Sequence, residues 1–492
     1  MRPRLLAWRA VIDVEATEPT TSAHRPPASR LAGVISLLRR HRALVLLLAA
    51  GAVLRIVAMV AVYPGIWFSD SNGYVSTAAS GTLNPTRVSG YSLVVAPFWQ
   101  IGSAALLIIT QHIVGLGIAV LLYALLRRRG VSPLLAVLAV VPVVLDAYLI
   151  QIEHTMMSET VFHAALVLGI AVLLWNERPG LATAAAAGLL LGYAAIVRSV
   201  AVPLIAVFLL YLIVRRVGWR PVLAFGLGWC LVIGGYATLY KIQHGKFGLT
   251  QSNGRFLYGK VAPFADCSRL SGVPANERFM CPDPRNPLTT NSAMWGRKSP
   301  IRGKPPSWDK RIRDFAMRVI RDRPLTYARV VALDFLHYFE PGHRIGRNDP
   351  LIVQWEFPTD PSHWGIPGYR GPIRPGHAVR GYSPKPYVSR MVDKPHWNAS
   401  ASKALHIYQR FAFTSGQVLA ICVILVLVAL ALRRGALRLR LDAALIAGSV
   451  LALLLFASAV SVFSYRYGLT AVVLLPAAAA LAGAALTQRK AG

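Results

Sequence analysis

The chain has few charges, and acidic residues are the scarcer kind. Only 15% of its 492 residues are charged, whereas 55% are hydrophobic. A soluble protein of this length needs more charged surface, and the apolar residues form repeated runs of about 20, the length that crosses a bilayer as a helix. The composition therefore argues against an ordinary soluble enzyme and predicts an all-α polytopic membrane protein.

The shortage of acids leaves 53 Lys and Arg against 21 Asp and Glu, a net charge of +32. Such an excess can mark a nucleic-acid-binding protein, but here much of it lies in short clusters beside the apolar runs, where it sets membrane orientation. The sequence contains no nucleic-acid-binding motif. We expect a lipid bilayer as a partner and no nucleic acid.

Cysteine is also scarce, with four residues and no CxxC spacing. Cys230 and Cys422 lie inside apolar runs and are expected to be inert packing residues. Cys267 and Cys281 share one polar loop. If that loop faces an oxidising compartment, a disulfide between them is the favoured interpretation.

The apolar runs and basic clusters predict about ten spans. Residues 1–42 are expected to form a disordered basic cytosolic tail, 43–240 a membrane domain of seven spans, and 409–492 one of three. Seven spans are expected at about 43–63, 103–126, 133–150, 180–197, 221–240, 411–432 and 443–463. The other three spans run back to the cytosolic side and end at Trp175, Arg215 and Arg489. The basic clusters place both termini in the cytosol.

A polar region, residues 241–408, separates the two membrane domains, and we call it the loop domain. It is too long for an ordinary connection, so we expect a small extracytoplasmic domain. Within it, residues 308–339 have helical spacing and Pro324 divides them. This pattern predicts two amphipathic helices that lie on the membrane surface. A further interfacial helix is expected at about 88–101.

The first external loop, residues 64–92, carries the most unusual residue of the sequence. Asp70 is the only carboxylate between Glu18 and Asp146. The predicted orientation gathers other ionisable residues at the same face: Arg87, Glu153, His154, Glu159, Arg198 and Arg466. Ionisable groups near a membrane are costly, so their convergence indicates a site. Arg55, inside the first span, either snorkels to headgroups or pairs with an anionic ligand.

Each of these residues also has a purely structural interpretation. Asp70 and Glu159 could cap helix N-termini. Arg198 and Arg466 could anchor the ends of spans at the headgroups. His154 is better interpreted as a hydrogen-bonded interface residue than as a metal ligand.

Four short motifs resemble the GT-C superfamily of polyprenyl-phosphate-sugar glycosyltransferases, particularly the bacterial protein-mannosyltransferase-like branch (glycosyltransferase family 39-like). They are Asp70-Ser-Asn-Gly-Tyr74, Ser158-Glu159, Val197-Arg198 and Tyr465-Arg466-Tyr467. The resemblance covers most of the membrane portion. It departs at Ser71, where many members carry a second acid. A single carboxylate is a poor site for a divalent cation. We therefore expect no cofactor, and the alternative of a bound divalent metal stays open without a paired-acid motif to support it.

The resemblance implies transfer of a sugar from a polyprenyl phosphate to a hydroxyl of a glycan, lipid or protein at the outer face of the plasma membrane. Asp70 is the expected general base. Arg466 and Arg198, with Arg55 as a third candidate, are expected to stabilise the departing phosphate. The other expected substrate-binding residues are Tyr74, Arg87, His154, Glu159 and Tyr465.

Three other functions compete with this one. A lipid or solute transporter would carry internal repeats and broken helices, and the sequence has no convincing repeat. A lipid-linked oligosaccharide polymerase or ligase would depend on the external arginines more than on Asp70. A scaffold without activity would tolerate the loss of Asp70.

Overall fold

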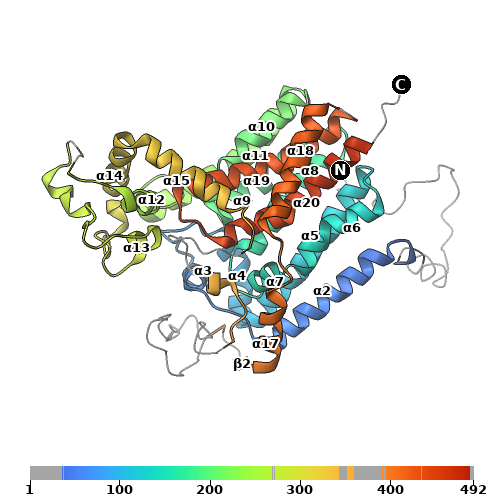
Figure 1. Cartoon of the computed structure of the whole chain (residues 1–492), viewed down its shortest axis with the longest axis horizontal. Helices are drawn as coiled ribbons and strands as arrows, with labels where there is room; N and C mark the ends of the chain where they lie inside the picture. Colours follow the sequence, from blue (N-terminus) through green and yellow to red (C-terminus); the bar gives the residue numbers. More distant parts are fainter. Residues whose placement is uncertain are drawn as a thin grey trace.

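Helices make up nearly all of the regular structure among the described residues, and they form an all-α polytopic membrane fold (Figure 1). The computed structural model describes residues 36, 38–268, 270, 272–342, 352–359, 390–391, 395–433 and 435–487. The predicted disordered tail lies almost entirely outside them. The one small sheet pairs β1 (Val62–Tyr63) with β2 (His396–Trp397), antiparallel.

Ten apolar segments lie where the sequence predicts ten spans. Five helices are long and apolar enough to cross a membrane: α2 (Arg42–Ala61), α5 (Ala104–Arg128), α11 (Trp219–His244), α19 (Leu437–Val460) and α20 (Tyr465–Thr487). Four shorter apolar helices are α8 (Glu159–Trp175), α9 (Leu181–Val197), α10 (Leu204–Val214) and α18 (Gly416–Leu432). The polytopic fold is thus confirmed, while the number of crossings stays a prediction.

The tenth segment is bent rather than straight. The predicted span 133–150 consists of α6 (Pro133–Leu145) and α7 (Ala147–Glu153), which meet at 54°. Buried Asp146 causes the break, because its side chain accepts hydrogen bonds from the backbone N–H groups of Tyr148 (3.0 Å) and Leu149 (3.2 Å) and starts a new helix. The bend leads the chain directly into the loop before α8.

The first external loop is more helical than its polar sequence predicts. It contains α3 (Ser69–Ser80), and the expected interfacial helix is α4 (Gly90–Ile101). Near the end of α2, β2 leads into α17 (Ala399–Gln409), which lies against α2 (Figure 1). Part of the loop domain therefore packs directly on the first span.

Residues 253–337 of the loop domain form a lobe beside the membrane helices (Figure 1). Its helices are α12 (Asn253–Val261), α13 (Thr290–Trp295), α14 (Asp309–Asp322) and α15 (Pro324–His337). The last two are the predicted pair divided at Pro324.

Of the two helices α14 and α15, only α15 exposes large apolar residues. The apolar residues of α14, Ile312, Phe315 and Val319, are buried against α12 in the core of the lobe, so they are not available to a membrane, and the surface location of α14 stays a prediction. In α15, by contrast, Leu325 is 85% exposed and Leu333 55%. The surface location of α15 stays a prediction.

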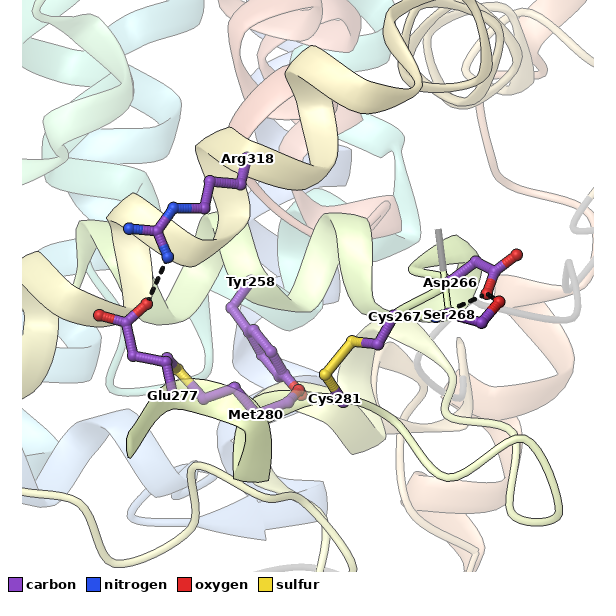
Figure 2. The surroundings of a disulfide bond; sticks show 8 residues. All are labelled: Tyr258, Asp266, Cys267, Ser268, Glu277, Met280, Cys281 and Arg318. Carbon is purple, nitrogen blue, oxygen red and sulfur yellow. Dashed lines mark hydrogen bonds and ion pairs between the residues drawn. A yellow bond between two sulfur atoms is a disulfide. The ribbon is translucent and has the colours of Figure 1, made fainter. Parts of the chain in front are cut away.

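Cys267 and Cys281 form a disulfide that packs against the core of this lobe, as Figure 2 shows. Beside it the Tyr258 hydroxyl donates a hydrogen bond to the carbonyl of Met280 (2.7 Å). The disulfide thus closes a loop that also contacts the core of the lobe.

Replacing Cys267 and Cys281 with serine should loosen this loop. A closed loop of about 15 residues is worth roughly 3 kcal/mol in the chain-entropy model. We expect faster hydrogen exchange across residues 267–281, whereas replacement of the free cysteines Cys230 and Cys422 should leave that exchange unchanged. Two free thiols at 267 and 281 in the unreduced native protein would contradict the disulfide.

The predicted orientation can be tested with single cysteines in a background without Cys230 and Cys422. Asn291, exposed on α13, should react with an impermeant thiol reagent on intact cells once it is replaced by cysteine. A cysteine at exposed Arg178, between α8 and α9, should react only after the membrane is opened. The reverse pattern would overturn the orientation.

Candidate active site: a carboxylate and arginine cluster

The N-terminus of α3 fixes the position of Asp70. Ser71 is fully buried, accepts a hydrogen bond from the Phe68 N–H (3.0 Å) and donates one to the carbonyl of Met156 (2.8 Å). Asp70 lies in the first turn of α3, but the N-cap is Phe68, so the simple capping interpretation of Asp70 fails. The Asp70 side chain is 20% exposed, and its carboxylate is therefore available to a ligand.

Ser71, the residue after Asp70, links two parts of the site. Through Met156 it connects α3 to the loop that opens α8. A second link is the Tyr74 hydroxyl, 3.2 Å from Ser158 Oγ. The starts of the two helices that carry Asp70 and Glu159 are therefore held together.

Five charged side chains from distant parts of the chain meet in one cluster. Arg87 Nη1 lies 2.6 Å from Asp70 Oδ1. Arg466 Nη1 lies 3.4 Å from Asp70 Oδ2 and also 3.4 Å from Glu159 Oε1. Arg198, directly after α9, forms an ion pair with Glu159. We call these five residues the charged cluster; its three arginines and two carboxylates leave one net positive charge.

Aromatic rings enclose the arginine at the start of α20. The Arg466 guanidinium lies 5.1 Å from the Trp355 ring centre, 5.2 Å from Tyr467 and 5.6 Å from Phe68. The Arg198 guanidinium lies 5.1 Å from Tyr467 as well. Cation–π contacts of this kind hold both guanidinium groups in a partly dry environment, where charges act more strongly. Sequence analysis did not identify Trp355, because tryptophans are common throughout the loop domain.

The arginines also determine the ionisation of Asp70. Burial raises the pKa of its carboxyl, but the nearby guanidinium groups of Arg87 and Arg466 outweigh burial and hold the pKa below its usual value. Asp70 is therefore a carboxylate at neutral pH, the form that a general base requires.

A pocket extends from the cluster between α8, α19 and α20. Charged and polar side chains line one end: Glu159, His163, Arg198, Arg466, Tyr467 and Thr470. Val200, Leu453 and Ala457 contribute an apolar wall. Glu159 is 1% exposed, and its Oε2 has no hydrogen-bond partner among the described residues. The pocket thus combines cations, a free acceptor and an apolar side.

Tyr74 and Tyr465 lie close to the cluster without joining its ion pairs. The Arg87 guanidinium is 5.9 Å from the centre of the Tyr74 ring. Tyr465, next to Arg466 in α20, packs on Tyr148, and the centres of the two rings are 4.7 Å apart. Tyr74 is positioned to orient Arg87, and Tyr465 to fix the start of α20.

Two predicted binding residues, Arg55 and His154, belong to a separate buried network. Arg55 donates through Nε and Nη2 to the two carboxylate oxygens of Glu153, each at 2.8 Å. His112 Nδ1 lies 3.0 Å from Glu153 Oε2 and His112 Nε2 lies 3.1 Å from His154 Nδ1. The structure does not bring Arg55 or His154 to Asp70, and buried Arg55 does not snorkel.

No group of three or more His, Cys, Asp or Glu side chains is arranged to hold a metal ion in the described part of the chain. Asp70 and Glu159, the two acids of the cluster, both face Arg466. The expectation that the protein needs no metal stays a prediction.

Residues 77–228 match the family model described as dolichyl-phosphate-mannose-protein mannosyltransferase, a family of the GT-C superfamily. No curated protein and no solved structure matches the chain. The match covers less than a third of the chain and, over that segment, supports the resemblance to the GT-C superfamily. The matched segment contains Arg87, Glu159 and Arg198, while Asp70 and Arg466 lie outside it.

Proposed function

We propose that this protein transfers a sugar from a polyprenyl phosphate to an acceptor hydroxyl at the extracytoplasmic face of the membrane, with Asp70 as the general base. The observation that carries the proposal is the position of Arg466, 3.4 Å from Asp70 and from Glu159. One guanidinium thereby joins a candidate base to a pocket lined by two arginines and an apolar side.

The cluster contains the groups that such a transfer needs. Asp70 accepts the proton of the acceptor hydroxyl while the hydroxyl oxygen attacks the anomeric carbon of the donor. The bond between that carbon and the phosphate oxygen breaks, and its electron pair leaves with the phosphate. Arg466 and Arg198 stabilise the developing charge on the departing oxygen. The products are a glycoside and a polyprenyl phosphate.

The charge of the cluster suits this donor. A polyprenyl-phosphate sugar is a phosphodiester with one negative charge, which balances the single net positive charge of the three arginines and two carboxylates. The apolar side of the pocket, formed by Val200, Leu453 and Ala457, is where we expect the first prenyl unit beside the phosphate to pack. A pyrophosphate-linked donor would bring more negative charge than the cluster balances.

The test is sugar transfer by the purified full-length protein in nanodiscs. Polyprenyl-phosphate donors carrying labelled mannose, another hexose or a pentose are each incubated with glycan, lipid and protein fractions of the native envelope. We expect label in one acceptor fraction and release of polyprenyl phosphate in equal amount. Transfer only from a pyrophosphate-linked oligosaccharide would instead support a polymerase or ligase.

Replacing Arg87 with glutamine should move the acidic limb of the pH–rate profile upward. Arg87 is the nearest group that lowers the pKa of Asp70, so its loss leaves the effect of burial less opposed. We expect kcat/KM of the parental protein to decline only below the ordinary carboxyl pKa of about 3.9, and that of the variant to decline at higher pH. If the acidic limbs of the two pH–rate profiles coincided, the ionisation of Asp70 would not control the rate.

A further inference from the structure

The proposed reaction, on which this inference rests, creates a product with more charge than its donor. The donor phosphodiester carries one negative charge at all relevant pH values. The released polyprenyl phosphate is a monoester, whose second pKa of about 6 gives it nearly two negative charges at pH 7. A pocket that relied on arginines alone would therefore bind the product more tightly than the donor, and release would limit turnover.

Glu159 lies where it can oppose this retention. Its Oε1 is 3.4 Å from Arg466 Nη1, and the same carboxylate pairs with Arg198. The side chain is 1% exposed and lines the pocket, and its Oε2 is unpartnered among the described residues. The carboxylate thus occupies, beside both arginines, the kind of position that a phosphate would take.

We propose that Glu159 promotes release of the polyprenyl phosphate by competing with it for Arg198 and Arg466. It acts on the phosphate through the two arginines and is therefore a positioning residue rather than a catalytic one. Its role is distinct from that of Asp70, which takes the acceptor proton.

The charges of the cluster explain the timing of release. With the donor bound, the cluster and the phosphodiester together are neutral. Directly after transfer they are still neutral, because the extra negative charge on the phosphate is offset by the proton on Asp70. When Asp70 returns this proton to water, the net positive charge of the cluster falls from two to one, and its attraction for the dianionic phosphate weakens. Without the charge of Glu159 the cluster would still carry two net positive charges at this stage, and the product would be held more tightly.

A simple structural role for Glu159 makes a different prediction. As a counter-ion that only holds Arg198 and Arg466 in place, Glu159 would strengthen binding of every phosphate, and its loss would weaken binding of donor and product alike. A competitor for the arginines has the opposite effect on the product. The affinity for polyprenyl phosphate therefore separates the two roles.

The experiment compares the parental protein with Glu159→Gln in nanodiscs. The probe is a short-chain polyprenyl phosphate, measured both by direct binding and as an inhibitor of transfer. We expect Glu159→Gln to bind it about tenfold more tightly, the lower end of what one nearby unit charge contributes at a protein surface. Both kcat and KM for the donor should fall, with a burst of product in the first turnover.

Glu277→Gln is the matched control, because Glu277 Oε2 pairs with Arg318 Nη1 at 2.8 Å in the loop domain, away from the cluster. It should keep the parental affinities. Glu159→Asp retains the charge and should release the product like the parental protein. Unchanged or weaker product binding by Glu159→Gln, while the parental protein transfers sugar, would overturn the inference and leave the proposed function standing.

A measurement on the parental protein alone covers the case in which Glu159→Gln does not fold. Its affinity for polyprenyl phosphate is compared with that for the methyl phosphodiester of the same lipid. We expect the monoester to bind no more tightly than the diester despite its extra charge. A clear preference for the monoester would overturn the inference, whereas absence of transfer from every donor would overturn the proposed function instead.

Discussion

Replacing Asp70 with asparagine is expected to lower the rate of sugar transfer by about 10²–10⁴-fold, the usual cost of losing a general base. Asparagine keeps the size of the side chain but cannot accept the proton of the acceptor hydroxyl. Donor affinity should be unchanged or slightly higher, because Arg466 then loses one of the two carboxylates that lie 3.4 Å from its Nη1. The variant should therefore separate catalysis from binding.

Transfer rate and donor binding would be measured for Asp70→Asn in nanodiscs. Asp283→Asn, which removes an exposed acid of the loop domain, is the control for a change of net charge and should keep the parental rate. If folded Asp70→Asn transferred sugar at the parental rate, Asp70 would not be the base.

Replacing Arg466 with alanine should weaken donor binding and slow turnover together. The guanidinium is expected to contact the donor phosphate before and during the reaction, so its loss affects both ground state and transition state. A hydrogen bond to a charged group is worth about 1.5–3 kcal/mol, so we expect kcat/KM to fall by about 10²-fold or more. This combined loss differs from the effect of Asp70→Asn.

The controls for Arg466 test charge and geometry separately. Arg466→Lys keeps the charge but loses the planar group that packs among Trp355, Tyr467 and Phe68, and it should recover only part of the donor affinity. Arg438→Ala removes an arginine that pairs with Glu177 elsewhere in the protein, and it should bind donor normally. Parental donor affinity in Arg466→Ala would exclude Arg466 from the phosphate site.

The sequence by itself determined the membrane architecture, because the signals are local. A run of apolar residues predicts a span whatever its neighbours are, and Pro324 separates α14 from α15 through its own backbone chemistry. The sequence also identified all five members of the charged cluster, because ionisable residues are rare near the membrane.

Only the tertiary structure decided which partner each of these side chains meets. Arg55 and Arg466 are both arginines within apolar segments, yet one is bound by Glu153 in a buried network and the other faces Asp70. The two pairs join residues 98 and 396 positions apart in the chain, so the packing of distant segments decides them. For the same reason the sequence could not show that Ser71 links α3 to the loop before α8.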